Sequence, residues 1–387
     1  MHTEDATATA ADAPLTTAPS PKPRLVALDA LRGATIALMI IVNNPGGPIS
    51  YGPLNHSTWN GWTITDTVFP TFLWIVGVSI TLSLAKRIAA GVPRRRLLSQ
   101  VLRRSVIIYA LGVAIYVAPR FDLSTQRVMG VLQRIAICYL IASVIYLYTS
   151  VRGQIVWMVS LLAAYWLLMT LVPVPGYGAG RLDVEGNLAH YVDRIVIGTH
   201  NYAETKTWDP EGIVSTLPAM ATALFGIMAG HILRLKSALS ERTTWLFLVG
   251  NGLIGLGLIC DMWLPINKKL WTDSFAIFMA GLDFVLLAAF VWVIDHLGHR
   301  RVVRPLEILG MNAIALYLAA EFGAEILDMF RVTSNGQAVS LQTWLYQTLF
   351  LRLTSPINAS LLYSVAFLGV IYLIAWGMYR RGWLVRI

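Results

Sequence analysis

The first long polar stretch of the chain contains two residues that could perform acid–base chemistry together. It reads LNHSTWNGWTITDTVFPTFLWI, residues 54–75, with His56 among small polar residues and Asp66 at the start of an apolar run. A carboxylate partner fixes the tautomer of an imidazole and raises its basicity, as general bases and nucleophiles require. Two plainer interpretations stay open: Asp66 could simply complement a helix dipole, and a lone loop histidine is more often a solvated surface residue.

Polar side chains also interrupt the apolar runs, where a charge costs roughly 2.5 to 3.5 kcal/mol on insertion scales. Asp29 and Arg32, in LDALRG, share a helix face, so they can pair, or Arg32 can meet an anionic ligand from the cytoplasm. Asn43 precedes PGG, which is often only a helix stop. Gln133 and Arg134 lie near the outer end of a later run, where Arg134 either snorkels or binds a ligand.

Three carboxylates farther along favour a competing function, proton-coupled transport. Asp283 lies near the middle of an apolar run, and Glu321 and Glu325 are four residues apart on another. Intramembrane carboxylates are typical of proton relays. The sequence has no HExxH, CxxC or two-His-one-carboxylate spacing, so we expect no metal site.

Composition predicts the class of protein. Of the 387 residues, 56% are hydrophobic and 13% are charged, and the mean hydropathy is +0.62. A soluble domain has about 25% charged residues, so we predict an integral membrane protein. The net charge of +9 is then explained by loop placement rather than by nucleic-acid binding. The Ala-, Thr- and Pro-rich residues 1–23 are expected to be a disordered tail.

The apolar runs predict an all-α, polytopic membrane fold. A bilayer core takes about 20 apolar residues per helix. On that length we predict ten transmembrane helices, at 28–46, 66–85, 101–118, 129–149, 154–173, 213–233, 244–262, 274–296, 308–328 and 360–379. The stretch 341–353 is too short to span and is expected to be an interfacial or re-entrant helix. Residues 24–387 would form a single transmembrane domain.

The basic residues predict the orientation. With a cytoplasmic N-terminus, most of the 30 Lys and Arg residues fall on cytoplasmic segments. An even number of spans then returns the C-terminus to the cytoplasm. His56 is expected to face outward, because the external segments are 47–65, 174–212, 263–271 and 329–359.

The same residues resemble a known family. LDALRGATIALMIIVNNPGG, followed by HSTWNGWTITDTVFPTFLWIVG, resembles the opening of the heparan-α-glucosaminide N-acetyltransferase family, part of a wider group of transmembrane acyltransferases. Similar segments follow in the same order: GVLQRIAICY, WDPEGIVSTLPAMATALFGIMAGHIL, LPINKKLW and LGMNAIALYL. Six such segments in order make a specific resemblance, which covers nearly the whole membrane region.

The resemblance implies an enzyme that passes acetyl from cytosolic acetyl-CoA to the amine of a glucosamine across the membrane. It assigns the active-site histidine to His56 and the active-site asparagine to Asn43, and Arg104 matches a family position. The segment between Asn43 and His56 is longer than in the lysosomal members, and Ala320 stands where those carry a histidine. Their large lumenal N-terminal domain has no counterpart in residues 1–23.

The chemistry expected from this resemblance is amine acetylation by a thioester. His56 would remove the amine proton in a ternary complex, and Asp66 would hold the imidazole. The Asn43 amide would donate to the thioester oxygen or the oxyanion. The alternative is a ping-pong route through an acetyl-imidazole on His56.

Two groups of residues are candidates for substrate binding. Those expected to bind acetyl-CoA, whose phosphates suit arginine, are Asp29, Arg32, Arg104, Gln133, Arg134 and Asn312. The PRRR run at 93–96 is more simply a topology signal. Those expected to bind the hydroxyl and ammonium groups of an amino sugar are Asp209, Glu211, Asn267 and Lys268. These four could instead only brace the loops.

We therefore predict a membrane acetyltransferase of glucosamine-type sugars, without nucleic acid or metal. Two alternatives stay open: a transporter of amino sugars, and an O-acetyltransferase of a cell-envelope glycan. The short tail favours a bacterial inner membrane with a periplasmic acceptor, and the family resemblance favours a homodimer.

Overall fold

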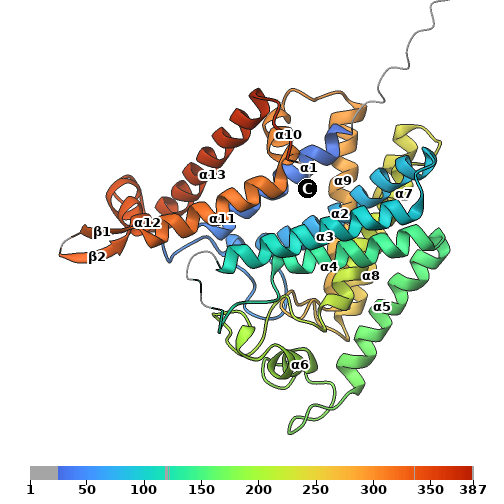
Figure 1. Cartoon of the computed structure of the whole chain (residues 1–387), viewed down its shortest axis with the longest axis horizontal. Helices are drawn as coiled ribbons and strands as arrows, with labels where there is room; N and C mark the ends of the chain where they lie inside the picture. Colours follow the sequence, from blue (N-terminus) through green and yellow to red (C-terminus); the bar gives the residue numbers. More distant parts are fainter. Residues whose placement is uncertain (1–24, 118–120, 122, 335, 386–387) are drawn as a thin grey trace, which may run out of the picture.

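Helices form nearly all of the regular structure, which confirms the predicted all-α, polytopic fold. The computed structural model describes residues 25–117, 121, 123–334 and 336–385 (Figure 1). The tail predicted for residues 1–23 lies outside this range. Strands β1 (Arg331–Ser334) and β2 (Gln337–Ser340) pair as an antiparallel hairpin.

The long helices follow the apolar runs, because a helix satisfies its own backbone N–H and C=O groups within a bilayer. They are α1 (Val26–Asn43), α2 (Ile64–Ala89), α3 (Arg94–Val117), α4 (Val131–Tyr148), α5 (Val151–Leu171), α7 (Thr216–Leu233), α8 (Leu239–Asp261), α9 (Asp273–Phe290) and α13 (Pro356–Arg380). The remaining helices are α6 (Leu188–Val196), α10 (Arg304–Met311), α11 (Ala313–Met329) and α12 (Leu341–Leu345). Short 3-10 and π-helical segments are Gly52–Leu54, Gly198–His200, Val291–His296 and Tyr346–Phe350.

Nine helices in the described part of the chain are long and apolar enough to cross a membrane, or ten if the bent pair α10–α11 counts as one span. The chain is a multi-pass membrane protein. The predicted ninth span, 308–328, is not one straight helix, because α10 and α11 meet at 82°. Asn312 has a non-helical backbone at this junction. Its side-chain amide accepts from Val385 N at 2.9 Å and donates to Trp383 O at 3.0 Å, so the C-terminal segment holds the bend.

The core of the bundle is the contact between α2 and α7, the two most buried spans. Glycines make this close approach possible, as is common between membrane helices. A Cβ atom at Gly77 would lie 1.9 Å from the carbonyl oxygen of Ala223, and Gly226 faces α2 equally closely. Gly33 and Gly310 join α1 to α10 in the same way. In contrast, α3, α5, α8 and α13 leave most of their surface outside the bundle, as lipid-facing helices do.

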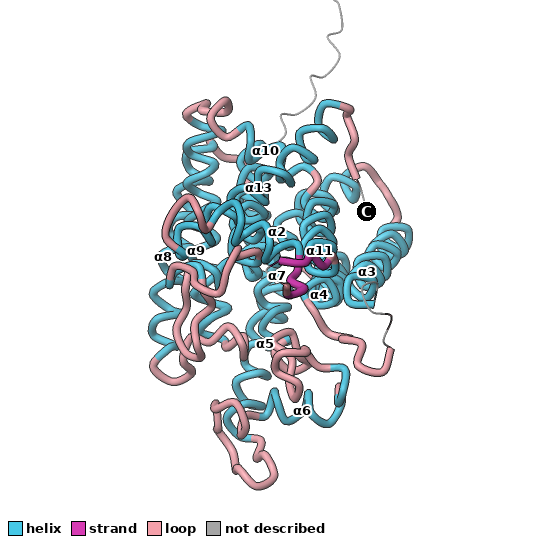
Figure 2. Tube along the Cα trace, turned by 90° about the vertical axis from the view of Figure 1, so that its left-hand side faces the viewer, coloured by secondary structure: helices cyan, strands magenta, loops and turns pink. Residues whose placement is uncertain are grey.

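The segments predicted to face outward contact one another. Gly61 N donates to Ile266 O at 2.7 Å, and the Trp59 and Trp208 rings pack edge to face at 6.2 Å. The hydroxyl of Tyr51 hydrogen-bonds to the first turn of α13. α6 and its long loop lie at the lower end of Figure 2, opposite α10. The loops rich in polar residues are thus gathered at one end of the bundle.

We predict that Gly77→Ala destabilises the protein by about 1–3 kcal/mol, because its Cβ would force α2 away from α7. The measurement is the unfolding temperature of the purified protein in detergent. The matched control is Gly252→Ala on α8, where a Cβ atom meets nothing within 4 Å. This control should leave the unfolding temperature unchanged or slightly higher, since alanine is the better helix former. Equal stability of the two variants would contradict the tight α2–α7 contact.

Candidate active site

His56 and Asp66 form a hydrogen-bonded pair at the start of α2. The chain leaves α1 at Asn43 and enters α2 after Thr63, whose backbone N–H donates to Asp66 Oδ2 at 3.0 Å in a capping box. Ser57 N donates to the same oxygen at 3.0 Å, so the loop folds back over the helix start. His56 Nδ1 then lies 2.7 Å from Asp66 Oδ1. The contact expected from the sequence is present.

This geometry fixes which nitrogen of His56 carries a proton. Asp66 is fully buried and already accepts two backbone N–H groups, so it acts as an acceptor toward the ring as well. Nδ1 therefore donates to Asp66, and Nε2 keeps its lone pair. The His56 side chain is 50% exposed, so part of the ring is accessible from outside the protein. The pair has the arrangement of a general base and its orienting carboxylate.

Lys268 lies against this pair from the turn between α8 and α9. Its Nζ atom is 3.1 Å from His56 Nδ1 and 3.7 Å from Asp66 Oδ1. The neighbouring Asn267 holds the turn, since it donates to Asn60 Oδ1 at 3.1 Å and accepts from a backbone N–H of its own turn at 3.0 Å. Of the residues predicted to bind the acceptor, Lys268 lies at the His56–Asp66 pair, whereas Asn267 braces the loops.

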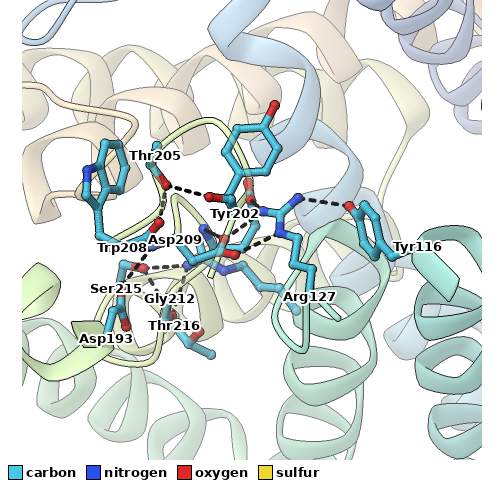
Figure 3. Close-up of polar contacts among 12 residues, drawn as sticks. Tyr116, Arg127, Asp193, Tyr202, Thr205, Trp208, Asp209, Gly212, Ser215 and Thr216 are labelled. Atoms are coloured by element: carbon cyan, nitrogen blue, oxygen red, sulfur yellow. Dashed lines mark hydrogen bonds and ion pairs between the residues drawn. The ribbon is translucent and has the colours of Figure 1, made fainter. Parts of the chain in front are cut away.

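Asp209 and Glu211 share a guanidinium that the sequence prediction did not include. Arg127 donates to the two carboxylate oxygens of Asp209 at 2.6 and 2.7 Å, and it also binds Glu211. Tyr116 accepts from Arg127 at 2.9 Å, and the Tyr202 ring lies 4.5 Å from the guanidinium (Figure 3). This buried cluster fixes the WDPEG segment against the loop between α3 and α4.

The ionisation of the cluster follows from burial and from its cations. Burial raises the pKa of Asp209. Burial also opposes the charged form of Glu211, but Arg127 and Arg134 outweigh it and hold the pKa of Glu211 below its ordinary value. Sequence reasoning missed Arg127 because a single arginine in a polar loop is usually solvated. The two carboxylates that follow Trp208 in the sequence could have indicated a cationic partner, since such a pair needs a cation when it is buried.

Arg134 and Gln133 lie inside the bundle. Arg134 is fully buried, donates to Gly212 O at 3.1 Å and to the Ser215 hydroxyl, and lies 5.1 Å from the Trp271 ring. It therefore ties the loop before α7 to α4. Gln133 is equally buried. Neither residue lines the large cavity between α1, α2, α3 and α4 that is described next. Their positions therefore do not support the predicted contact with acetyl-CoA, which stays a prediction.

A cavity of about 640 Å³ is lined by α1–α4 and by the α10–α11 bend. One end is basic and carries Arg32, Arg87, Arg103 and Arg104. Arg32 makes the predicted pair with Asp29 at 3.0 Å and also donates to Ser79 at 3.0 Å. Most of the remaining wall is apolar. The cavity can therefore hold a long ligand with an anionic head and a less polar arm.

The other end of the cavity leads towards Asn43 and Glu321. Met39 and Tyr317 line it, and each lies about one helical turn before Asn43 or Glu321 on the same helix face. The Asn43 side chain lies close to the Glu321 carboxylate and favours its charged form. The hydrogen bonds of the described residues do not join Asn43 to His56, although Asn43 ends α1 and His56 lies in the loop that follows it. Their joint action stays a prediction.

Three other residues that the sequence singled out are Asn312, Asp283 and Glu325, and the contacts described for them are structural. Asn312 binds the C-terminal backbone and does not line the cavity, although Met311 and Ala313 do. Asp283 is buried and accepts from the Thr71 hydroxyl at 2.5 Å, between α9 and α2. Glu325 is exposed. Among the described residues, no group of three His, Cys, Asp or Glu side chains is placed to hold a metal ion.

A buried histidine supports the loop that carries His56. The His190 ring stacks on Trp208 at 4.0 Å, and Trp59 packs edge-on against His190 at 5.7 Å. His190 Nδ1 lies 2.8 Å from Val184 O, so this nitrogen donates to the carbonyl. Burial lowers the pKa of His190 to about 3. The loop that carries His56 therefore packs, through Trp59, against the uncharged rings of His190 and Trp208.

Comparisons with known proteins match the sequence of this site. A family model described as "Heparan-alpha-glucosaminide N-acetyltransferase, catalytic" matches residues 24–257. The human protein named heparan-alpha-glucosaminide N-acetyltransferase is 31% identical over 356 residues, covering 77% of this chain and 53% of the human protein. The mouse protein of the same name is 30% identical over 364 residues, covering 79% of this chain and 54% of the mouse protein. The chain thus spans about half the length of the curated relatives it matches.

We predict that His190→Phe makes the protein relatively more stable as the pH falls. In the unfolded chain His190 binds a proton below pH 6.5, whereas in the folded protein it stays neutral down to about pH 3. The free energy of unfolding therefore falls as the pH is lowered from 6.5 to 3, and His190 does not affect its pH dependence above 6.5. Phenylalanine keeps the stack on Trp208 without this loss. The stability difference between variant and wild type should rise by about 2 kcal/mol between pH 6.5 and pH 5.

The measurement is the unfolding temperature of both proteins in detergent across that pH range. Substitution of the exposed His299 by Phe is the control and should show the same pH dependence as wild type. A pH-independent difference between His190→Phe and wild type would contradict the neutral, buried state of His190.

Proposed function

The chain belongs to the heparan-alpha-glucosaminide N-acetyltransferase family, and from this premise we propose that it is a transmembrane acetyltransferase. Acetyl-CoA is the co-substrate and binds from the cytoplasm. The acetyl group passes to the amine of a glucosamine-type sugar on the outer side. We further propose that the membrane is a bacterial inner membrane, that both termini are cytoplasmic, and that residues 24–387 act as one catalytic domain.

The main support for this function is the cavity, which has a basic end and an opposite end about one helical turn from Asn43 and Glu321. Arg32 and Asn43 lie about three turns apart on α1, roughly 16 Å along the axis. An extended pantetheine arm has a comparable reach. With its phosphates at Arg32 and Arg104, acetyl-CoA would lie along the apolar wall and bring its thioester to Asn43. The whole cofactor therefore need not cross the membrane.

The residues beyond the cavity supply the groups that amine acetylation needs. The amine nitrogen attacks the thioester carbonyl carbon, His56 Nε2 takes the amine proton, and the CoA sulfur leaves as the C–N bond forms. Asp66 holds the Nδ1–H group and stabilises the imidazolium that results. The Asn43 NH₂ group donates to the oxyanion. Glu321, beside Asn43, offers a carboxylate to the polar groups of the acceptor.

The sequence left two roles open for Asp209 and Glu211, binding the sugar or bracing the loops, and this proposal takes the second. Arg127 already binds both carboxylates. We therefore assign them to shaping the outer loops around the acceptor rather than to direct contact with the sugar. Asn267, which braces two loops, is assigned in the same way.

The alternative functions gain no specific observation from the structure. The transporter hypothesis relies on Asp283, Glu321 and Glu325. Asp283 is hydrogen-bonded to Thr71 in the core, Glu321 lies beside Asn43, and Glu325 is exposed. O-acetylation of a glycan would use the same donor site and differs in the acceptor atom. Glucosamine and a matching sugar without a free amine distinguish N- from O-acetylation directly.

We predict that His56→Ala lowers acetyl transfer to glucosamine by a factor of about 100 or more, because the general base is lost. The assay uses purified protein in detergent, labelled acetyl-CoA and glucosamine, without any gradient. His299→Ala, at an exposed histidine far along the chain, is the control and should keep the wild-type rate. Wild-type turnover by the His56 variant would contradict the assignment.

The same assay separates the two kinetic routes. In the ternary-complex route that we propose, acetyl-CoA alone leaves no acetyl group on the enzyme. An acetyl-imidazole on His56, found by mass spectrometry before glucosamine is added, would establish the ping-pong route instead.

We predict that Arg104→Glu raises the KM for acetyl-CoA about tenfold, because a carboxylate in the basic end of the cavity repels the phosphates. The KM for glucosamine should change little. Arg95→Glu is the matched control, since Arg95 is on the same helix, α3, but does not line the cavity. An unchanged KM for acetyl-CoA in the Arg104 variant would remove this arginine from the donor site.

A further inference from the structure

Lys268 occupies a position that the roles assigned so far do not explain. Its Nζ atom lies 3.1 Å from Nδ1 and 3.5 Å from Nε2 of His56, and 3.7 Å from Asp66 Oδ1. An ammonium group at these distances lies close to the part of the ring that carries the two nitrogens. Nδ1 already donates to Asp66, so Lys268 cannot donate to that nitrogen. Its effect on the ring is therefore chiefly that of a nearby positive charge.

The turn that carries Lys268 is held rigidly. Asn267 is fully buried, and its backbone N–H donates to Thr272 Oγ1 at 3.0 Å. Gly61 N donates to Ile266 O at 2.7 Å, which fixes the turn to the loop of His56. The Lys268 side chain itself is only 15% exposed. The ammonium group is therefore held in place rather than free in solvent, and its charge is weakly screened.

Charged groups from two other segments face Lys268. Asp66, at the start of α2, contacts both His56 and Lys268. Glu211, from the loop before α7, acts on Lys268 through its charge. Lys269 points away, since its Nζ atom donates to Thr58 O at 2.6 Å. Burial lowers the pKa of Lys268, whereas Asp66 and Glu211 both favour its charged form.

The two residues that touch His56 act on it in opposite directions. A carboxylate favours an imidazolium and a nearby ammonium opposes it, by simple electrostatics. Asp66 alone would both fix the tautomer of the ring and favour a second proton on it. With Lys268 added, the Nδ1–H tautomer is kept by Asp66 while a second proton on Nε2 is opposed. The pair of opposite charges therefore orients the ring without occupying its lone pair.

We propose that Lys268 is a positioning residue whose positive charge opposes a second proton on His56 and so leaves Nε2 free as the proton acceptor. This inference rests on the proposed acetyl transfer and adds to it a residue that sets the working pH of the base. During the reaction His56 Nε2 takes one proton from the amine as the C–N bond forms and the C–S bond breaks. Lys268 then favours release of that proton, which passes to the CoA thiolate and restores the neutral ring.

The test measures the protonation of His56 without relying on turnover. Diethyl pyrocarbonate modifies the uncharged imidazole, and mass spectrometry of the full-length protein's peptides gives the rate at His56 as a function of pH. We expect Lys268→Met to move the midpoint of this curve upward by about one pH unit, because the opposing charge is removed. Two controls should have midpoints near that of wild type. Lys268→Arg keeps the positive charge at this position, and Lys269→Met removes the positive charge of the neighbouring lysine instead. An unmoved midpoint in Lys268→Met overturns the proposal.

The pH profile of kcat/KM for acetyl transfer gives the second readout. The acidic limb of Lys268→Met should move upward by the same amount, with the plateau at high pH close to that of wild type. A lower plateau with an unmoved limb would show that Lys268 stabilises the oxyanion, and this outcome overturns the proposal. Inactive wild type, or active His56→Ala, would refute the proposed function instead. The modification midpoint still decides the role of Lys268 in that case, so the two failures are distinguishable.

Discussion

A buried carboxylate at the first turn of α2 holds together the polar loops at one end of the helix bundle. Asp66 accepts from the backbone N–H groups of Ser57 and Thr63, from the Thr63 hydroxyl and from His56, and it forms an ion pair with Lys268. These donors come from the loop after α1, from the helix cap and from the turn between α8 and α9. A buried carboxylate is stable only when it is hydrogen-bonded and paired with positive charge. Asp66 therefore holds the His56 imidazole and the Lys268 ammonium group next to each other.

The membrane imposes the second constraint. A span must keep its polar groups satisfied, so the cavity wall is mostly apolar and its charged groups lie at one end. Departures from regular helix occur where a cavity or another segment takes up the freed backbone groups. The α10–α11 bend lines the cavity, and Asn312 at its corner binds the C-terminal segment. In the proposed function, this arrangement lets a donor bound at one side react with an acceptor at the other.

Local features of this structure were predictable from the sequence, and distant pairings were not. The spans follow from the length of the apolar runs, and the Asp29–Arg32 and His56–Asp66 contacts join residues close in the chain. By contrast, Arg127 meets Asp209 across 82 positions, and Lys268 meets His56 across 212. The bend at Asn312 depends on Trp383, 71 positions away, so the hydropathy of 308–328 gave no sign of it. Such pairings depend on how helices pack, which single-residue patterns do not encode.

The most direct test of the account is an experimental structure of the protein with acetyl-CoA bound, solved by cryo-electron microscopy in lipid nanodiscs. If acetyl-CoA binds as proposed, its density lies along the cavity, with the phosphates at Arg32 and Arg104 and the acetyl group beside Asn43, on the side facing His56. Density for the cofactor at the outer loops around α6, or an acetyl group left at the basic end far from His56, would contradict it.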